Sequence, residues 1–281
     1  MPLDTAVFLT MRSALKAMAP ILLGCAALYA LLPTTGLAQT SGTIHYQRTV
    51  KPEIPEGVEL PPELPQEIRE QLLASMSAVD TTAWGLHFTE KASLMTPASD
   101  SAAIADRSAS HSRGDTFVRV RMRRSQDRSV TYTDLEAWTV TEQKDFLGRT
   151  FLIRGDRPEY AWRLTGEQSE YLGFACQKAV TEADSAMVEA WFAPELPVSI
   201  GPASFGGLPG AILVLSIDDG NLTTWNATHV SPGMPQEALM AAPEKGREVT
   251  QEEFAAIVKE KTEEMQNQGD NGRVVIRRVD R

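Results

Sequence analysis

The strongest constraint on the fold is a rapid succession of short segments in which apolar and polar residues alternate. Alternation with a period of two places successive side chains on opposite faces of a β-strand. Segments with this pattern or a β-type composition are residues 43–50, 81–95, 116–124, 129–133, 137–141, 150–154, 159–164, 174–182, 186–192 and 211–217. Most intervals after residue 116 are too short for the crossover helix that parallel neighbours require. The sequence therefore predicts an α+β domain dominated by one curved antiparallel sheet, of which a half-barrel is one form.

Two helices are predicted to pack on this sheet. Residues 66–77 follow Pro65 and carry apolar residues at helical spacing, which predicts a short inserted helix. Thr250 and Glu253 have the T-x-x-E spacing of a capping box. This spacing predicts the start of a second helix over residues 250–266.

The connecting regions are recognised by composition. Residues 51–80 form an insertion, in which residues 51–65 hold five prolines and precede the short helix. Residues 97–113 are small and polar without apolar period, which predicts a mobile loop. Residues 267–281 are interpreted as a basic tail in preference to an edge strand. Residues 218–221 (DDGN) predict a hairpin turn, with a calcium loop as the alternative.

The N-terminus has the pattern of a secretory signal peptide over residues 1–38. Arg12 and Lys16 precede an apolar run at 21–32, and small residues lead up to Ala38. The run is shorter than the roughly 20 residues that a membrane-spanning helix needs. We therefore expect cleavage after Ala38 and a single exported domain over residues 39–281, located in the periplasm or cell envelope.

Two alternatives stay open for this leader. Translation could start at Met11, which begins a conventional charged leader. Cys25 ends the string LLGC, which is the pattern of a lipobox, so the protein could instead be a lipoprotein anchored through Cys25. Against this, the residues after Cys25 stay strongly apolar.

Charge and cysteine content exclude some classes of protein. The chain has 37 acidic and 27 basic residues and a formal net charge of -10, which argues against nucleic-acid binding. Cleavage after Ala38 would leave Cys176 as the single cysteine, so the mature chain could form no internal disulfide. Cys176 is interpreted as a buried small hydrophobic residue, with a reactive thiol as the alternative.

The most distinctive strings lie between residues 171 and 213. They are YLGFACQKA at 171–179, AWFAPELP at 190–197, Gly201-Pro202, and GLPGAIL at 207–213. In this order they closely resemble the GLPGLI family of secreted bacterial proteins, with Ala211 where that family usually has a bulkier residue. The resemblance implies an exported location and a fold. It implies no activity and no cofactor, because the role of that family is unassigned.

The glycines and prolines of this motif have two interpretations. The architectural interpretation is a rigid connection that returns the chain to the sheet. The functional interpretation is a contact surface for an apolar, peptide or protein ligand. Its candidate residues are Trp191, Phe192, Phe205, Gly207, Leu208, Pro209 and Gly210.

A local positive stripe is the other candidate site. Arg119, Arg121 and Arg123 alternate with apolar residues and share one strand face. The stripe is interpreted as a solvated face, with an anion contact or a peripheral contact with acidic lipid as the alternative.

No catalytic constellation can be named from the sequence. Ser204 lacks the G-x-S-x-G spacing, and the four histidines are scattered without a metal-ligand motif, although neighbouring strands could bring His45 and His87 together. We therefore predict a non-catalytic binding module without catalytic residue, metal or cofactor. The alternative is a periplasmic enzyme, or a thiol- or metal-dependent protein, that uses Cys176 or scattered histidines and carboxylates.

Overall fold

A computed structural model describes residues 39–53, 66–98, 107–113, 116–122, 127–267 and 274–278. The chain divides into two units, Met1–Ala38 and Gln39–Arg281, and every described residue belongs to the second. The predicted signal peptide, with its alternatives at Met11 and Cys25, therefore lies outside the described residues. Most of the proline-rich stretch, residues 54–65, also lies outside them.

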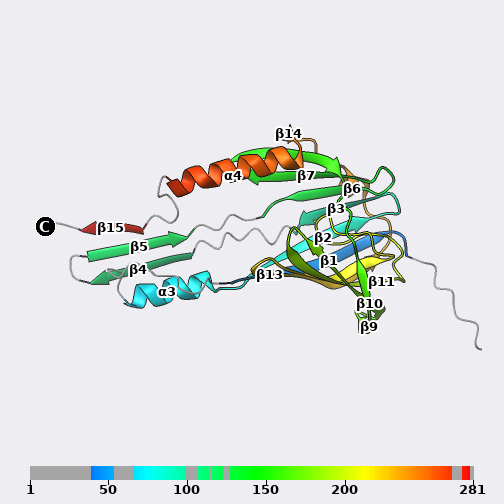
Figure 1. The fold of residues 1–281 in the computed structure, drawn as a ribbon, viewed down its shortest axis with the longest axis horizontal. Coiled ribbons are helices and arrows are strands. Elements are labelled where there is room, and N and C mark those ends of the chain that lie inside the picture. The colour runs from blue at the N-terminus through cyan, green and yellow to red at the C-terminus, as the bar shows by residue number, and fades with distance from the viewer. Residues whose placement is uncertain are drawn as a thin grey trace, which may run out of the picture. The chain divides into compact units, whose positions relative to one another are not determined.

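The described chain is dominated by one twelve-stranded sheet (Figure 1). In their order across the sheet the strands are β14 (Arg247–Val249), β8 (Arg149–Asp156), β7 (Thr139–Phe146), β6 (Val130–Asp134), β3 (Ala92–Pro97), β2 (Asp80–Phe88), β1 (Gly42–Pro52), β13 (Asn221–Pro232), β12 (Ala211–Asp218), β11 (Ala186–Ala193), β10 (Phe174–Ala183) and β9 (Arg163–Tyr171). All neighbours are antiparallel except β14 and β8. The prediction of a largely antiparallel β fold with few helices is confirmed.

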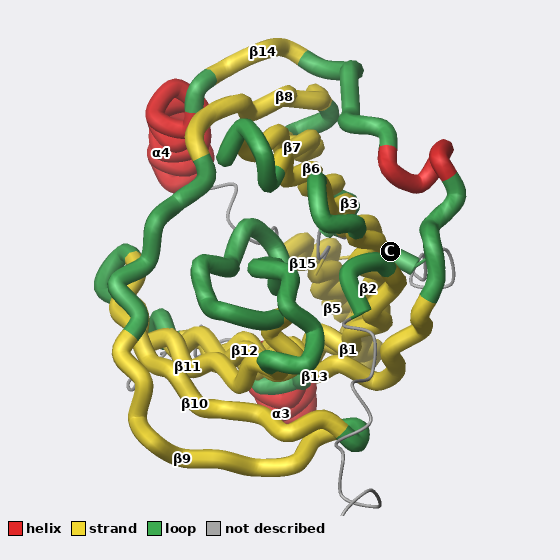
Figure 2. The backbone as a smooth tube through the Cα atoms, turned by 90° about the vertical axis from the view of Figure 1, so that its right-hand side faces the viewer, coloured by secondary structure: helices red, strands yellow, loops and turns green. Residues whose placement is uncertain are grey.

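The sheet is open, with β14 and β9 as its edges, and does not close into a barrel. Figure 2 shows it curving, so that β8 and β7 face β11 and β10. We call β14, β8, β7, β6 and β3 the first arm, and β12, β11, β10 and β9 the second arm.

A second, three-stranded sheet in the order β15-β5-β4 was not predicted. Its strands are β4 (Arg107–Arg113), β5 (Thr116–Met122) and β15 (Val274–Arg278). Residues 107–113 are therefore a strand and not part of a loop, while residues 99–106 lie outside the described residues. Residues 274–278 form an edge strand, so the preference for a tail was wrong there. In both cases the strand is formed by backbone pairing with β5, which requires no apolar period in the partner sequence.

Two strand boundaries also differ from the prediction. The strand predicted at 159–164 begins at Arg163, because Pro158 lacks an N–H group and the backbone N–H of Trp162 turns back to the carbonyl of Tyr160 at 2.9 Å. The strand predicted at 137–141 begins after Trp138, whose φ of 58° is incompatible with extended backbone.

The two described α-helices are α3 (Gln66–Met76) and α4 (Gln251–Asn267); a 3₁₀ turn, η3, covers Glu237–Met240. The capping box of α4 is confirmed. The N–H of Glu253 donates to the Thr250 hydroxyl at 3.2 Å, and the N–H of Thr250 donates to the Glu253 carboxylate at 2.8 Å. Phe254 packs against Phe151 of β8 at 5.3 Å, so α4 lies on the large sheet as predicted. In contrast, α3 lies against β4 of the small sheet.

The core fills one side of the large sheet. It is built from buried side chains that alternate along β1, β2, β11, β12 and β13 and from the connection between β11 and β12. Its largest fully buried members include Ile44, Tyr46, Phe88, Phe192, Leu196, Ile200, Ile212 and Leu213. The predicted hairpin is confirmed, because Asp218 pairs with Leu222 across the turn between β12 and β13.

Candidate ligand-binding cleft

A cleft of about 720 Å³ lies between the two arms of the sheet. Its walls come from β7, β8, the connection 157–162, the β10–β11 hairpin, the ends of β12 and α4, and the connection 194–210. The lining includes Glu142, Lys144, Arg154, Asp156, Glu159, Tyr160, Glu182, Asp184, Ala203, Ser204, Phe205 and Asp219. A volume of this size is typical of pockets that hold small ligands or short peptide segments.

An aromatic pair forms part of the cleft wall. The rings of Tyr160 and Phe205 stack with their centroids 4.6 Å apart and their planes 17° apart. Burial raises the pKa of Tyr160. The hydrogen bond with Ser204 and the positive charge of Arg157 lower this pKa by smaller amounts. Tyr160 is therefore a neutral phenol at physiological pH, and the pair offers an apolar surface with one polar edge.

The cleft is acidic. Among the described residues, six carboxylates line it, from Glu142, Asp156, Glu159, Glu182, Asp184 and Asp219, against two cations, Lys144 and Arg154. Lys144 is 2.6 Å from Glu142, and Arg154 is 3.3 Å from Glu248, which lies outside the cleft. Of these six carboxylates, Glu142 is the one that forms an ion pair with another described residue. The cleft therefore presents a negative field that favours a cationic ligand.

The connection 194–210 is folded tightly against the second arm. The N–H of Ala211 donates to the carbonyl of Leu196, and that of Ile212 donates to Ile200, both at 2.9 Å. A Cβ at Gly210 would lie 2.3 Å from the carbonyl oxygen of Ala193, so any side chain at Gly210 would collide with the backbone. These contacts support the architectural interpretation of the motif.

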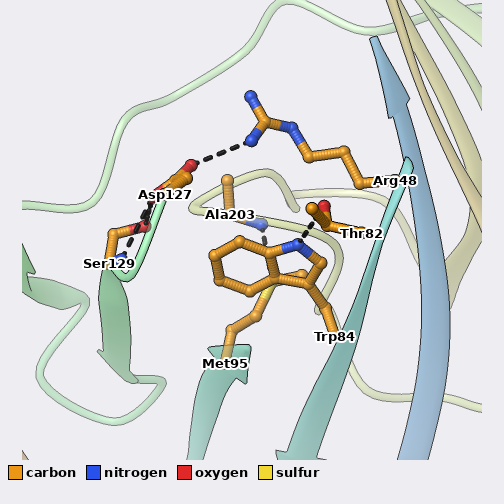
Figure 3. A network of polar contacts seen from close by, with 7 residues as sticks. All are labelled: Arg48, Thr82, Trp84, Met95, Asp127, Ser129 and Ala203. Atoms are coloured by element: carbon orange, nitrogen blue, oxygen red, sulfur yellow. Dashed lines mark hydrogen bonds and ion pairs between the residues drawn. The ribbon is translucent and has the colours of Figure 1, made fainter. Parts of the chain in front are cut away.

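Ala203, which lines the cleft, joins this connection to the first arm by a hydrogen bond. Its backbone N–H donates to Sδ of Met95 on β3, at 3.0 Å (Figure 3). In the same view Trp84 Nε1 donates to the Thr82 hydroxyl at 3.0 Å, and Arg48 pairs with Asp127 at 2.9 Å.

The predicted ligand-contact residues do not form one surface. Phe192 is fully buried in the core and Leu208 is 3% exposed, so a ligand could reach neither without displacing core packing. Trp191 is half-buried and packs against the core, and the ammonium of Lys178 lies 6.0 Å from the centre of its ring. Phe205 stacks instead on Tyr160. Of the predicted residues, Phe205 is the one that lines the cleft.

The glycines of the predicted surface have structural roles. Gly207 has a φ of 87°, which favours glycine, and its N–H donates to the Ser199 hydroxyl at 2.7 Å. Pro209 is exposed beside the buried Gly210.

Cys176 is 1% exposed. Burial raises the pKa of its thiol, and the neighbouring Glu195 raises it further. Both effects disfavour the thiolate, so the structure agrees with the interpretation of Cys176 as a small buried hydrophobic residue.

The arginine stripe is only partly described. Arg119 and Arg121 lie on β5, opposite Ser110 and Ser108 of β4. Their side chains, and Arg123 altogether, lie outside the described part of the structure. The anion contact therefore stays a prediction.

Three histidines come together on the strands β2, β1 and β13. His45 lies directly opposite His229, and their rings are 6.2 Å apart. His87 pairs in register with Thr43, whose hydroxyl is 2.9 Å from Nδ1 of His87. Burial and the charge of His45 lower the pKa of His87. Within the described residues, no group of three or more His, Cys, Asp or Glu side chains is arranged to hold a metal ion.

Sequence reasoning missed Tyr160, which lines the cleft from the connection between β8 and β9. It also missed Arg157 and Trp162, which hydrogen-bond to the connection 194–210. The sequence RPEYAW held one available signal. Pro158 interrupts the strand pattern there, which indicates that Tyr160 and Trp162 lie in a connection and not in a strand of the sheet.

A family model described as "Protein of unknown function (Porph_ging)" matches residues 163–214. This segment runs from the start of β9 into β12 and includes all the strings on which the resemblance to the GLPGLI family rests. The match covers less than a fifth of the chain, and the GLPGLI assignment stays a prediction. No match was found among curated proteins.

Among solved structures, the chain is similar to PNGF-II in two crystal forms. In space group C2 the identity is 13% and the TM-score 0.48, over 77% of this chain and 32% of that chain. In space group P21 the identity is 14% and the TM-score 0.46, over 76% and 32%. The chain thus corresponds to about a third of the length of PNGF-II, and TM-scores below 0.5 do not establish a common fold. Among the described helices, none combines the length and hydrophobicity needed to span a membrane.

Proposed function

We propose that this protein is an exported cell-envelope binding module that holds a basic peptide segment in the cleft between the two arms. The observation that carries the proposal is the combination of six carboxylates with the Tyr160–Phe205 stack around one cleft. Carboxylates attract Lys and Arg side chains, and an aromatic surface packs against their aliphatic stems. The curved sheet supports the half-barrel form suggested by the sequence.

The charge of the cleft favours a peptide over the purely apolar ligand that the sequence also allowed. A purely apolar molecule would have to desolvate carboxylates without compensating them, which is costly. A basic segment of a peptide or partner protein compensates them. The buried thiol of Cys176 and its raised pKa count against the enzymatic alternative that uses this residue.

Fluorescence anisotropy with labelled hexalysine, and with hexaglutamate as the matched probe, tests this function on the purified chain. We expect hexalysine to bind and hexaglutamate not to bind. The pair of changes Glu182→Gln and Asp184→Asn should weaken hexalysine binding by about tenfold, because each removed charge lowers the attractive potential of the cleft.

The pair Glu244→Gln and Glu263→Gln is the matched control, since both residues are exposed and outside the cleft. It removes the same two charges from the protein and should leave the affinity close to that of the unaltered chain. Equal losses in the control and cleft variants would mean that net charge alone attracts the probe, and the proposal would be abandoned.

The cellular location is part of the proposal and rests on the leader-like pattern of residues 1–38. N-terminal sequencing of the mature protein should give Gln39 as the first residue. An acylated Cys25 at the N-terminus would replace this location with that of a lipoprotein.

A further inference from the structure

Arg157 is a buried cation held by the connection 194–210. Arg157 is 4% exposed, and it is the residue that directly follows β8 of the first arm. Nη2 donates to the carbonyl of Ser199 at 2.8 Å and to that of Phe205 at 3.2 Å. Its guanidinium lies 4.9 Å from the ring centre of Trp138. Arg157 thus links the end of the first arm to the connection that lies on the second.

This placement is costly for the stability of the fold. Within the described residues, Nε and Nη1 of Arg157 are buried without a hydrogen-bond partner, and no carboxylate pairs with the guanidinium. Burial without a counter-charge lowers the pKa of Arg157. Replacing buried charged groups by apolar residues of similar size is often neutral or stabilising. Stability alone therefore does not explain an arginine at this position.

Gly206 has no side chain, and the guanidinium of Arg157 occupies the space that a side chain would need. A Cβ at Gly206 would lie 1.6 Å from Nη2 and 2.6 Å from Cζ of Arg157. The carbonyl of Gly206 accepts a hydrogen bond from Trp162 Nε1 at 2.7 Å. The residue before the GLPG motif is thus a glycine because the arginine occupies the space that its side chain would need.

The contacts of Arg157 converge on the aromatic pair of the cleft. The carbonyl of Phe205 accepts one of the hydrogen bonds from Arg157, and the ring of Phe205 stacks on Tyr160. Tyr160 itself follows Arg157 by three residues in the chain. Ser204 and Phe205 lie between the anchor at Ala203 and the anchor at Gly206. We call Ser204 and Phe205 the cleft lip.

We propose that Arg157 is a positioning residue that holds the cleft lip in place and thereby sets the affinity of the cleft. The affinity part rests on the proposed function, whereas the position of the lip can be measured without any ligand. Arg157 need not touch the ligand, because it acts through the carbonyls of Ser199 and Phe205.

Arg157→Met is the main test, with the full chain and labelled hexalysine as the probe. It removes the charge and keeps most of the length of the side chain. We expect the urea midpoint of unfolding to stay the same or rise. The affinity for hexalysine should fall by about tenfold, because the cleft lip no longer keeps its position against the ligand. Arg157 does not line the cleft but lies between the lining residues Asp156 and Pro158. Loss of this nearby cation should by charge alone strengthen hexalysine binding, so a loss of affinity identifies positioning.

Arg149→Met is the matched control, because Arg149 lies on the same strand, β8, is exposed and does not line the cleft. This variant should bind hexalysine as well as the unaltered chain or better. Arg157→Lys keeps a charge but loses the guanidinium that spans two carbonyls, and it should lose affinity like Arg157→Met. Full affinity in both Arg157 variants would overturn the role of Arg157 in binding.

Amide hydrogen exchange gives the readout that needs no ligand. In Arg157→Met we expect peptides that cover residues 199–207 to exchange faster by about tenfold, while peptides from β1 and β12 keep their protection. Unchanged exchange in residues 199–207 would overturn the positioning role. If the unaltered chain does not bind hexalysine, the proposed function fails while the exchange result still decides the role of Arg157.

A double-substitution cycle tests the contact itself. Gly206→Ala should lower the urea midpoint markedly in the unaltered chain, because its Cβ meets the guanidinium. In the Arg157→Ala background the same change should lower the midpoint clearly less, since the guanidinium is gone and the closest remaining atom is the Ser199 carbonyl oxygen, 2.9 Å from the added Cβ. Equal losses in both backgrounds would show that the two residues are not coupled.

Discussion

The hydroxyl of Tyr46 on β1 donates a hydrogen bond to the backbone carbonyl of Ile212 on β12, and the two oxygens are 2.5 Å apart. Tyr46 is 1% exposed, and burial raises the pKa of its phenol far above the ordinary value. The bond spans β13, which lies between the two strands. It ties the strand that follows the GLPG motif to the first strand of the domain.

Tyr46→Phe should lower the free energy of unfolding by about 1–3 kcal/mol, because the carbonyl of Ile212 loses its partner in a buried site. Urea unfolding measures the change. Tyr171→Phe is a matched control, because Tyr171 also bonds a carbonyl, that of Ala227 at 2.7 Å, but is less buried. A larger loss for Tyr171→Phe than for Tyr46→Phe would contradict this account of the core.

Thr250→Ala should destabilise the domain by about 1 kcal/mol, because it removes the hydroxyl that accepts the N–H of Glu253 at the start of α4. The loss is measured by chemical unfolding. Thr250→Ser keeps an oxygen in the capping position and should retain most of the stability. If Ser and Ala cost the same, the hydroxyl does not cap the helix.

Stability should decrease as the pH falls through the ordinary histidine range near 6.5. The pKa of His87 is lowered in the folded state, chiefly by burial and secondly by His45, so the unfolded chain takes up the proton first. The contribution of His87 is fully present above about pH 6.5 and is lost as the pH falls toward its folded pKa. Urea midpoints measured from pH 8 to pH 5 follow this loss, and His87→Gln should flatten the curve. An unchanged slope in that variant would assign the pH dependence to other groups.

The Cys176 thiol should react with a water-soluble disulfide reagent about a hundredfold more slowly in the native chain than in urea, because reaction requires a local opening. A Cys25→Ser variant leaves Cys176 as the single thiol. Rapid native labelling would revive the interpretation of Cys176 as a reactive group and favour the enzymatic alternative.

Local signals in the sequence predicted much of the large sheet. Alternation located β1, β10, β11 and β12 to within a residue or two, since burial of one strand face leaves a period of two in the sequence. The strands β4 and β15 carry no such signal, because their pairing depends on the backbone of β5.

The sequence by itself determined the strand-rich class, the capped helix at Thr250 and the hairpin after Asp218, because each depends on residues that are neighbours in the chain. Only the tertiary structure decided which side chains form the cleft. Tyr160 meets Phe205, and Arg157 meets Gly206, across more than forty residues of chain, because the sheet curves and the connection 194–210 folds back between its arms. Contacts at such separations depend on the position of every strand between them, and no local pattern of residues encodes that position.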